Sequence, residues 1–298
     1  MPKISAMILL AVFSLLPFVY GQSMRVPEGF QAAPGTQPEA FTNTGWAQAV
    51  VHLKTGIEMV FIPAGSFQMG SPASEAGRHR DETPVHTVHI SNGFYLGKYQ
   101  VTQEQWQKIM GNNPAKFKES GTRAPVENVD WDQCQAFCRL AGSGLRLPTE
   151  GEWEYACRAG TTTAFCYGDS LDSTMANFDG NYPYGNGSKG PYRKSTVPVG
   201  QFQPNAWGLY DMHGNVWEWC QDGYDENYYQ NSPRKDPPGA SGSEIISRVV
   251  RGGSWYGNAK STRSANRNRL VPSPSHEGYD YSGDSRGLRV AAGLPAAP

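Results

Sequence analysis

The sequence predicts an α+β fold with little regular secondary structure and unusually long ordered loops. Turn-forming residues are abundant, with 34 glycines and 22 prolines in a chain of 298 residues. Short apolar patterns typical of strands occupy residues 51–101. Capped helix patterns end near Gly160, and no long periodic segment follows. Loops of this length need internal fastening by polar networks, bound ions or disulfides.

The N-terminal residues differ in character from the rest of the chain. Lys3 precedes an apolar run over residues 7–20, which is shorter than the roughly 20 residues of a membrane span, and the small Gly21 follows. This pattern predicts a secretory signal peptide over residues 1–21, and an uncleaved N-terminal anchor is the alternative. We therefore expect an exported protein, periplasmic or extracellular, with no membrane span after signal removal.

Composition changes twice more along the chain. Residues 22–50 are rich in Pro, Gly, Ala, Thr and Gln without periodicity, which predicts a flexible N-terminal linker. The folded domain is expected over residues 51–292, followed by a tail at 293–298. The chain carries 26 basic and 27 acidic side chains, so bulk charge does not favour a nucleic-acid partner. We expect an exported protein or a small molecule as the ligand.

Local patterns place the regular elements before Gly160. Runs of apolar and turn residues predict strands within 59–70, 85–90 and 93–101. Three polar residues can cap helices by accepting from first-turn amides: Thr102, Asp130 and Thr149. Thr149 and Glu152 also form a capping box. We therefore expect helices that begin at residues 103, 131 and 150.

Export would place the cysteines in an oxidising compartment. Their number is odd, so at least one thiol is expected to be unpaired or to pair between chains. The set is Cys134, Cys138, Cys157, Cys166 and Cys220. No C-x-x-C pattern occurs, which disfavours zinc-ribbon and thioredoxin-like sites. The simplest alternative is that these thiols are small buried side chains.

Two polar, aromatic-rich stretches cover residues 176–194 and 207–220. The second is rich in oxygen donors, which suits a hard cation such as Ca²⁺. Asn215 and Glu218 could supply side-chain oxygens, and Gly214 and Val216 could supply carbonyls. The alternative is that Asn215 fixes a turn and that Glu218 pairs with an arginine.

A third stretch follows the Gly252-Gly253 pair. Residues 256–269 mix Tyr, Asn, Ser, Thr and Arg with almost no aliphatic residues. This composition is typical of a recognition surface, and an ordinary solvated loop is the alternative. The chain has no P-loop, no G-x-S-x-G and no H-E-x-x-H, and no spacing identifies a Cys–His nucleophile pair.

Seven motifs together resemble the formylglycine-generating-enzyme, or sulfatase-modifying factor, domain family, in the family's order and over residues 51–292. They are M-V-F-I-P-A-G-S-F-Q-M-G-S (59–71), L-G-K-Y-Q-V-T (96–102), R-L-P-T-E-G-E-W-E-Y-A (146–156), G-L-Y-D-M-H-G-N-V-W-E-W (208–219), R-G-G-S-W (251–255), R-S-A-N-R (263–267) and G-L-R-V (287–290). The resemblance implies the formylglycine-generating-enzyme type of C-type-lectin-like fold.

The resemblance also implies structural Ca²⁺ at two places. One set is Asn177, Phe178 and Tyr192. The second set is Gly214, Asn215, Val216 and Glu218. By the same resemblance, Ser254 and Trp219 match active-site positions.

One departure places the chain in a cysteine-less branch of that family. Formylglycine-generating enzymes carry two copper-binding cysteines shortly after the Gly-Gly-Ser, whereas residues 256–267 contain none here. We therefore do not expect copper or formylglycine formation, although iron remains possible. The family's disulfide partners near Ser264 and Val290 are also missing, so Cys138 and Cys157 lose their expected mates.

Two functions follow from this comparison. The first is an exported modifying enzyme or oxidoreductase other than a formylglycine-forming one. The second is a lectin-like module that binds a ligand or protein, with a C-terminal surface like those diversified by retroelements. The expected binding surface is Trp255, Tyr256, Asn258, Arg263, Asn266, Arg267 and Tyr281.

Overall fold

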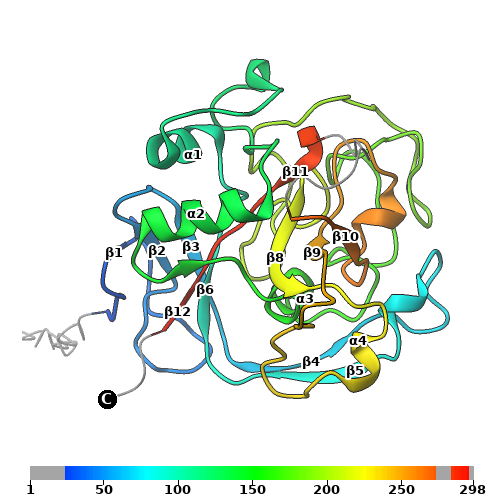
Figure 1. Cartoon of the computed structure of the whole chain (residues 1–298), viewed down its shortest axis with the longest axis horizontal. Coiled ribbons are helices and arrows are strands. Elements are labelled where there is room, and N and C mark those ends of the chain that lie inside the picture. Colours follow the sequence, from blue (N-terminus) through cyan, green and yellow to red (C-terminus); the bar gives the residue numbers. More distant parts are fainter. Residues whose placement is uncertain (1–23, 273–282, 295–298) are drawn as a thin grey trace, which may run out of the picture.

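Six short strands from both ends of the chain form the larger sheet. Their order is β1 (Phe30–Ala32), β2 (Ala49–His52), β3 (Glu58–Ile62), β6 (Phe94–Gly97), β12 (Ala291–Gly293) and β7 (Leu145–Arg146). Every neighbouring pair is antiparallel. The computed structural model describes residues 24–272 and 283–294, and in it β12 lies between β6 and β7, which come from much earlier in the chain (Figure 1).

A smaller sheet and a hairpin complete the β-structure of this part of the chain. The sheet has the order β10 (Asn268–Leu270), β9 (Arg248–Arg251), β8 (Trp217–Gly223) and β11 (Arg286–Gly287), with β11 parallel to β8. The hairpin pairs β4 (Gly65–Met69) with β5 (His86–Ile90). The three predicted strand runs contain β3, β4, β5 and β6, so these predictions are confirmed.

The three predicted helices form where their caps indicate. They are α1 (Gln103–Met110), α2 (Trp131–Ala141) and α3 (Glu150–Arg158). Each has a reciprocal capping box, in which the cap side chain accepts from the third helical amide and the third side chain accepts from the cap amide. The rings of Trp106 and Phe137 stack 5.3 Å apart and join α1 to α2.

The remaining helices are single turns that punctuate the loops. They are α4 (Tyr228–Asn231) and the 3₁₀ helices η1 (Arg80–Glu82), η2 (Lys118–Ser120), η3 (Ala259–Thr262) and η4 (Gly283–Ser285). Short strands, few helices and long connections confirm the predicted α+β class. No helix of the described residues is long and apolar enough to cross a membrane, and the predicted signal peptide lies outside these residues.

The prediction of a flexible linker is wrong for residues 24–50. Strand β1 pairs with β2 over three residues, and Trp46 and Ala47 are buried in the main core. The Ala47 carbonyl accepts a hydrogen bond of 2.6 Å from the hydroxyl of Tyr95. The Arg25 guanidinium lies 4.2 Å from the Trp46 ring. Long-range pairing and burial of one large aromatic residue order a segment whose local composition carries no periodicity.

We expect Trp46→Ala to lower the free energy of unfolding by about 3–5 kcal/mol, because it empties a buried aromatic site in the main core. Urea denaturation measures the change. Leu53→Ala is the matched control, because Leu53 is 57% exposed, and it should shift stability by no more than about 0.5 kcal/mol. Equal, small effects of both substitutions would mean that residues 24–50 add nothing to the fold.

Candidate functional site

Buried arginines fasten the segment that follows the Gly252-Gly253 pair. Arg263 makes two bonds of 2.7 and 2.8 Å to the carboxylate of Glu82. Arg267 makes two bonds of 2.7 and 3.0 Å to Glu150. Both arginines were expected on a binding surface, and this prediction is wrong for Arg263, which is fully buried. Arg267 is also mostly buried and paired with a buried carboxylate, although it lines a hollow of the surface. A guanidinium held in this two-point geometry is neutralised within the fold.

The other residues of the predicted binding surface differ in exposure and in hydrogen bonding. Tyr256 is 38% exposed. Trp255 donates to the Asp284 carbonyl and stacks on Tyr192. Asn258 caps η3 by accepting from the Ser261 amide. Tyr256 therefore remains available for recognition.

Asn266 and Tyr281 also belong to the predicted binding surface. Asn266 is only 4% exposed, although it lines a hollow of the surface. Tyr281 lies outside the described residues.

A groove runs beside strands β8 and β10. It consists of two adjoining hollows of about 230 and 560 Å³ that share Trp217, Ser261 and Asn268, and we call it the Trp217 groove. Tyr256 and Arg286 line the smaller hollow, among others. Aromatic faces, hydroxyls and amides thus line a common concave surface, which is the chemistry that recognises ligands by contact and hydrogen bonding.

The larger hollow of the groove also carries charge. Arg80, Asp81, Glu226 and Arg269 line it, together with the hydroxyl-bearing ring of Tyr224. The Tyr224 hydroxyl donates 2.8 Å to Asp81. Burial and this hydrogen bond raise the pKa of Tyr224 to about 12. The hydroxyl therefore stays protonated at neutral pH.

The two predicted catalytic residues do not line the groove. Trp219 is fully buried in the main core, where its ring nitrogen donates 3.0 Å to the Val129 carbonyl. Ser254 is also fully buried, and its hydroxyl has no hydrogen-bond partner. Sequence reasoning missed Trp217, which lies two residues earlier on the same strand. Alternation on β8 gives Trp217 and Trp219 the same face, and both are buried in the main core, so the sequence could not show that Trp217, at 7% exposure, also lines the groove.

An oxygen cage surrounds the side-chain amide of Gln100. The Gln100 Nε2 atom lies 2.9–3.2 Å from four oxygens: the carbonyls of Asp211, Gly214 and Val216, and Oε1 of Glu218. One amide nitrogen carries two hydrogens, and Arg289 also donates to Glu218 Oε1, so these donors can leave as few as one of the four acceptors without a hydrogen. Within the part of the chain that the structure describes, the buried Gln100 Oε1 atom has no hydrogen-bond partner. The Gln100 amide nitrogen therefore fills the centre of this oxygen cage.

Three of the predicted calcium ligands contribute to this cage, and Asn215 does not. Glu218 also accepts from Arg289 at 2.9 and 3.0 Å and from Trp153 at 2.7 Å, so it does pair with an arginine. The Asn215 side chain instead bonds both the amide and the carbonyl of Val197, each at 3.0 Å. That side chain therefore joins its own turn to the loop at residue 197 and does not face the cage.

The other predicted calcium set is more scattered. Asn177 is buried, and its Nδ2 donates to Asn215 at 3.0 Å, while its Oδ1 has no partner. Phe178 lies in a small hydrophobic cluster. The Tyr192 ring packs against Trp255. Among the described residues, no group of three or more His, Cys, Asp or Glu side chains is placed to hold a metal.

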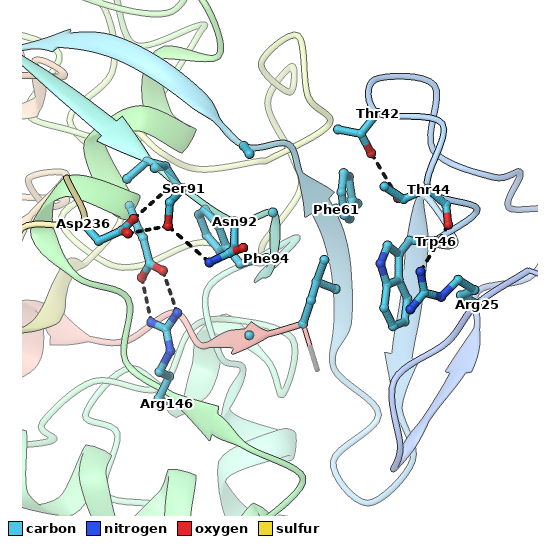
Figure 2. A pocket seen from close by; sticks show the side chains of 16 residues that line it. Arg25, Thr42, Thr44, Trp46, Phe61, Ser91, Asn92, Phe94, Arg146 and Asp236 are labelled. Atoms are coloured by element: carbon cyan, nitrogen blue, oxygen red, sulfur yellow. Dashed lines mark hydrogen bonds and ion pairs between the residues drawn. The ribbon is translucent and has the colours of Figure 1, made fainter. Parts of the chain in front are cut away.

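A larger hollow of about 820 Å³ lies away from all predicted site residues. Figure 2 shows Trp46, Phe61 and Phe94 around it, with the ion pair of Arg146 and Glu152 at one side. No residue of the predicted site lines it. The polar groups on its wall are mostly paired with one another.

Comparison with protein families gives one match over most of the chain. The model described as the sulfatase-modifying factor enzyme 1-like domain matches residues 48–291. The formylglycine-generating enzyme of Streptomyces coelicolor is 31% identical over 250 residues, covering 66% of this chain and 78% of that enzyme. The serine/threonine-protein kinase pkn1 of Chlamydia caviae is 31% identical over 249 residues. That match covers 75% of this chain, which spans only 37% of the length of the kinase.

Solved structures show the same architecture. PvdO from Pseudomonas aeruginosa superposes with a TM-score of 0.69 and 31% identity, covering 83% of this chain and 98% of that one. Variable protein 1 of Treponema denticola superposes with a TM-score of 0.63 and 27% identity, covering 80% and 95%. These similarities confirm the predicted formylglycine-generating-enzyme type of C-type-lectin-like fold.

We expect Arg263→Ala to destabilise the fold by about 3–5 kcal/mol, since it leaves the buried carboxylate of Glu82 without its cation. Arg269→Ala is the matched control, because its guanidinium lines the groove and it should leave stability within about 0.5 kcal/mol. Thermal and urea unfolding measure both. Equal stability of Arg263→Ala and the control would contradict the role given to this buried ion pair.

Asp222 predicts a pH dependence of stability. Its carboxylate accepts 2.9 Å from the Glu150 amide, and burial, with the charge of Glu150, raises its pKa from 3.8 to about 8. The folded state therefore binds the proton more tightly than the unfolded state. The resulting stability is present below about pH 4 and is lost as the pH rises through about 8.

Asp222→Asn cannot ionise, so its free energy of unfolding should depend less on pH between about 4 and 8 than that of the unsubstituted chain, by roughly 1–3 kcal/mol. Urea titrations across that range measure the difference. Asp132→Asn, at an exposed position, is the control and should follow the unsubstituted chain. Parallel pH profiles for all three proteins would contradict the assigned proton.

Proposed function

The chain belongs to the sulfatase-modifying factor, or formylglycine-generating-enzyme-like, family, and from this premise we propose that it is an exported member that binds a ligand in the Trp217 groove without forming formylglycine. The groove carries this proposal. Tyr256 offers an exposed aromatic ring, Trp217 lines the groove although it is only 7% exposed, and Ser261 and Asn268 offer hydrogen bonds on the same concave surface. The ligand would be a small molecule or an exposed segment of another exported protein.

The sequence of the groove argues against copper chemistry of the family type. Residues 256–267 contribute Tyr256, Gly257, Ser261, Asn266 and Arg267 to the groove, and the segment contains no cysteine. Soft Cu(I) is held by thiolate or thioether ligands, which this segment lacks. Similarity to a protein titled a variable protein supports a scaffold whose surface serves recognition.

Oxidative modification is the second candidate function. It is favoured by the 31% identity to a formylglycine-generating enzyme that the chain covers over most of its length. The unpartnered hydroxyl of Ser254, directly after the two glycines, is the feature of the fold that this candidate would use. Iron is the metal that we would test for it.

We expect a random-sequence peptide library displayed on phage to enrich on the unsubstituted protein, and the double variant Tyr256→Ala/Arg269→Ala to lose at least tenfold of the binding. Both side chains lie at the groove, so their removal takes away contact area and charge. Leu140→Ala, an exposed position on α2, is the control.

A parallel assay separates the two candidate functions. The protein is supplied with copper or iron, oxygen and a cysteine-containing sulfatase peptide, and aldehyde and oxygen consumption are measured. We expect neither aldehyde nor oxygen uptake. Sustained oxygen uptake that the groove variant abolishes would replace binding with oxidation.

We further propose that Ca²⁺ binds at the oxygen cage. The carbonyls of Asp211, Gly214 and Val216 and the carboxylate of Glu218 would hold it, in the place that the Gln100 amide nitrogen now fills. The convergence of four oxygens on one point supports this site, because Ca²⁺ binds through oxygen ligands. Binding would require the Gln100 side chain to move out of the cage. The charge of the ion would brace a loop between two sheets. The set at Asn177, Phe178 and Tyr192 stays a prediction.

We expect chelation by EGTA to lower the melting temperature by about 5–10 °C, because a bound ion stabilises only the folded state. Added Ca²⁺ should restore it and Mg²⁺ should not, since Mg²⁺ demands a smaller octahedral site. Elemental mass spectrometry of the purified protein counts the ion. An unchanged melting temperature together with a calcium-free sample would contradict the proposal.

A further inference from the structure

The outermost strand of the smaller sheet forms part of the Trp217 groove. β10 is the last strand in the order of that sheet, and within the described residues only β9 pairs with it (Figure 1). Asn268 lines both hollows of the groove, Arg269 lines the larger one and Leu270 lines the smaller one. In this part of the chain, the strand thus combines an unpaired edge with residues that line the groove.

The pairing of β9 shows which of its backbone groups face β10. Where β9 joins β8, the Ser247 carbonyl accepts a hydrogen bond of 3.0 Å from the Tyr224 amide. Ser247 therefore directs its backbone groups toward β8. Successive residues of a strand direct theirs to opposite sides, so Arg248 and Val250 turn their amides and carbonyls toward β10.

The same alternation leaves Arg269 facing the open edge of β10. Leu270 and Asn268 lie opposite Arg248 and Val250, so they are the residues that can exchange ladder hydrogen bonds with β9. Arg269, between them, directs its amide and carbonyl away from β9. A separate contact agrees with this direction, because the Arg269 amide donates 2.8 Å to the side-chain Oδ1 of Asn268 in an exposed position.

Backbone groups at an open edge match the backbone of another extended chain. Only a peptide supplies N–H and C=O groups in alternation at the spacing of a strand, so an added strand repeats the ladder. The charges of the larger hollow do not favour one sign, since Arg80 and Arg269 line it together with Asp81 and Glu226. The main chain, rather than net charge, is therefore the recognition element that this edge offers.

We propose that the Trp217 groove takes an extended peptide segment of another protein, which adds to β10 as a further strand and bonds the amide and carbonyl of Arg269. This inference rests on the proposed function, because it names the ligand class of the same groove. A carbonyl of the peptide replaces Asn268 Oδ1 as the acceptor of the Arg269 amide. Side chains at alternate positions of the peptide then meet the hollows, where Tyr256, 38% exposed, offers contact area.

Methylation of the peptide backbone tests the main-chain pairing. A peptide enriched from the phage library on the full chain is synthesised, together with one derivative for each amide nitrogen that is methylated in turn. Methylation of the amide that donates to the Arg269 carbonyl should weaken binding at least about tenfold, because it removes a hydrogen bond and blocks the approach of the strand. Methylation of either adjacent amide, which faces away from β10, should cost less than about threefold. Fluorescence anisotropy measures both.

Arg269→Pro tests the protein side of the same pairing. Proline removes the outward amide hydrogen and leaves the ladder groups of Asn268 and Leu270 in place, and edge strands accept proline in this orientation. Arg269→Ala is the matched control, because it removes the side chain and keeps the amide. Arg269→Pro should bind the unmethylated peptide at least about tenfold more weakly than this control. Urea unfolding compares the folds of the two variants, and if Arg269→Pro does not fold, the methylation series alone decides.

The outcomes separate strand addition from ligand binding in general. A peptide that requires the side chains of Tyr256 and Arg269 but tolerates methylation of every amide would leave binding in the groove standing and would overturn strand addition. A library without any enriched peptide would contradict both. Dimers of the unliganded chain that Arg269→Pro dissociates, measured by light scattering, would assign the edge to a second copy and overturn the peptide as its occupant.

Discussion

Buried pairs of arginine and glutamate are the interaction on which the rest of this structure depends. Arg251 and Glu154 are both fully buried and joined by a direct ion pair. The same guanidinium donates to the carbonyls of Ser264 and Ala265, each at 2.9 Å. A buried charge is tolerated only when it is paired and its hydrogen bonds are satisfied. Each such arginine therefore anchors a loop, because the loop's carbonyls supply the acceptors that its guanidinium requires.

The same principle connects the C-terminal part of the chain to earlier segments. Arg289 pairs with Glu218 and also donates 2.8 Å to the Gly97 carbonyl and 2.7 Å to the Tyr210 carbonyl. Its neighbours continue directly into β12, so the C-terminal strand is tied both by sheet pairing and by this cation. Buried ion pairs of this kind can thus order loops that have no regular secondary structure.

One turn separates the oxygen cage from a buried histidine. The carbonyls of Asp211 and Gly214 face Gln100 in the oxygen cage, while His213, between them, faces Cys166. Asp211 and Asn215 have positive φ angles of 57° and 70°, which lets successive groups point in different directions.

The sequence by itself determined the family, the helix starts and the oxygen-rich character of the turn. Local signals carry this information: Thr102, Asp130 and Thr149 form caps with residues three positions away, and motif order needs no tertiary knowledge. The three cage ligands at Gly214, Val216 and Glu218 lie close in sequence, so spacing brought them together. Gln100 could not be found in this way, because it joins the cage from more than a hundred residues away.

Only the tertiary structure decided which polar residues are buried and which are free. Arg263 and Arg267 lie in a stretch whose composition is typical of a recognition surface. Glu82 and Glu150 nevertheless neutralise their charges from distant segments of the chain. Likewise, nothing local shows that Cys166 meets His213. The physical reason is common to these cases. The free energy of a charged or polar side chain depends on its partners and its burial, and both are set by contacts that local sequence patterns do not encode.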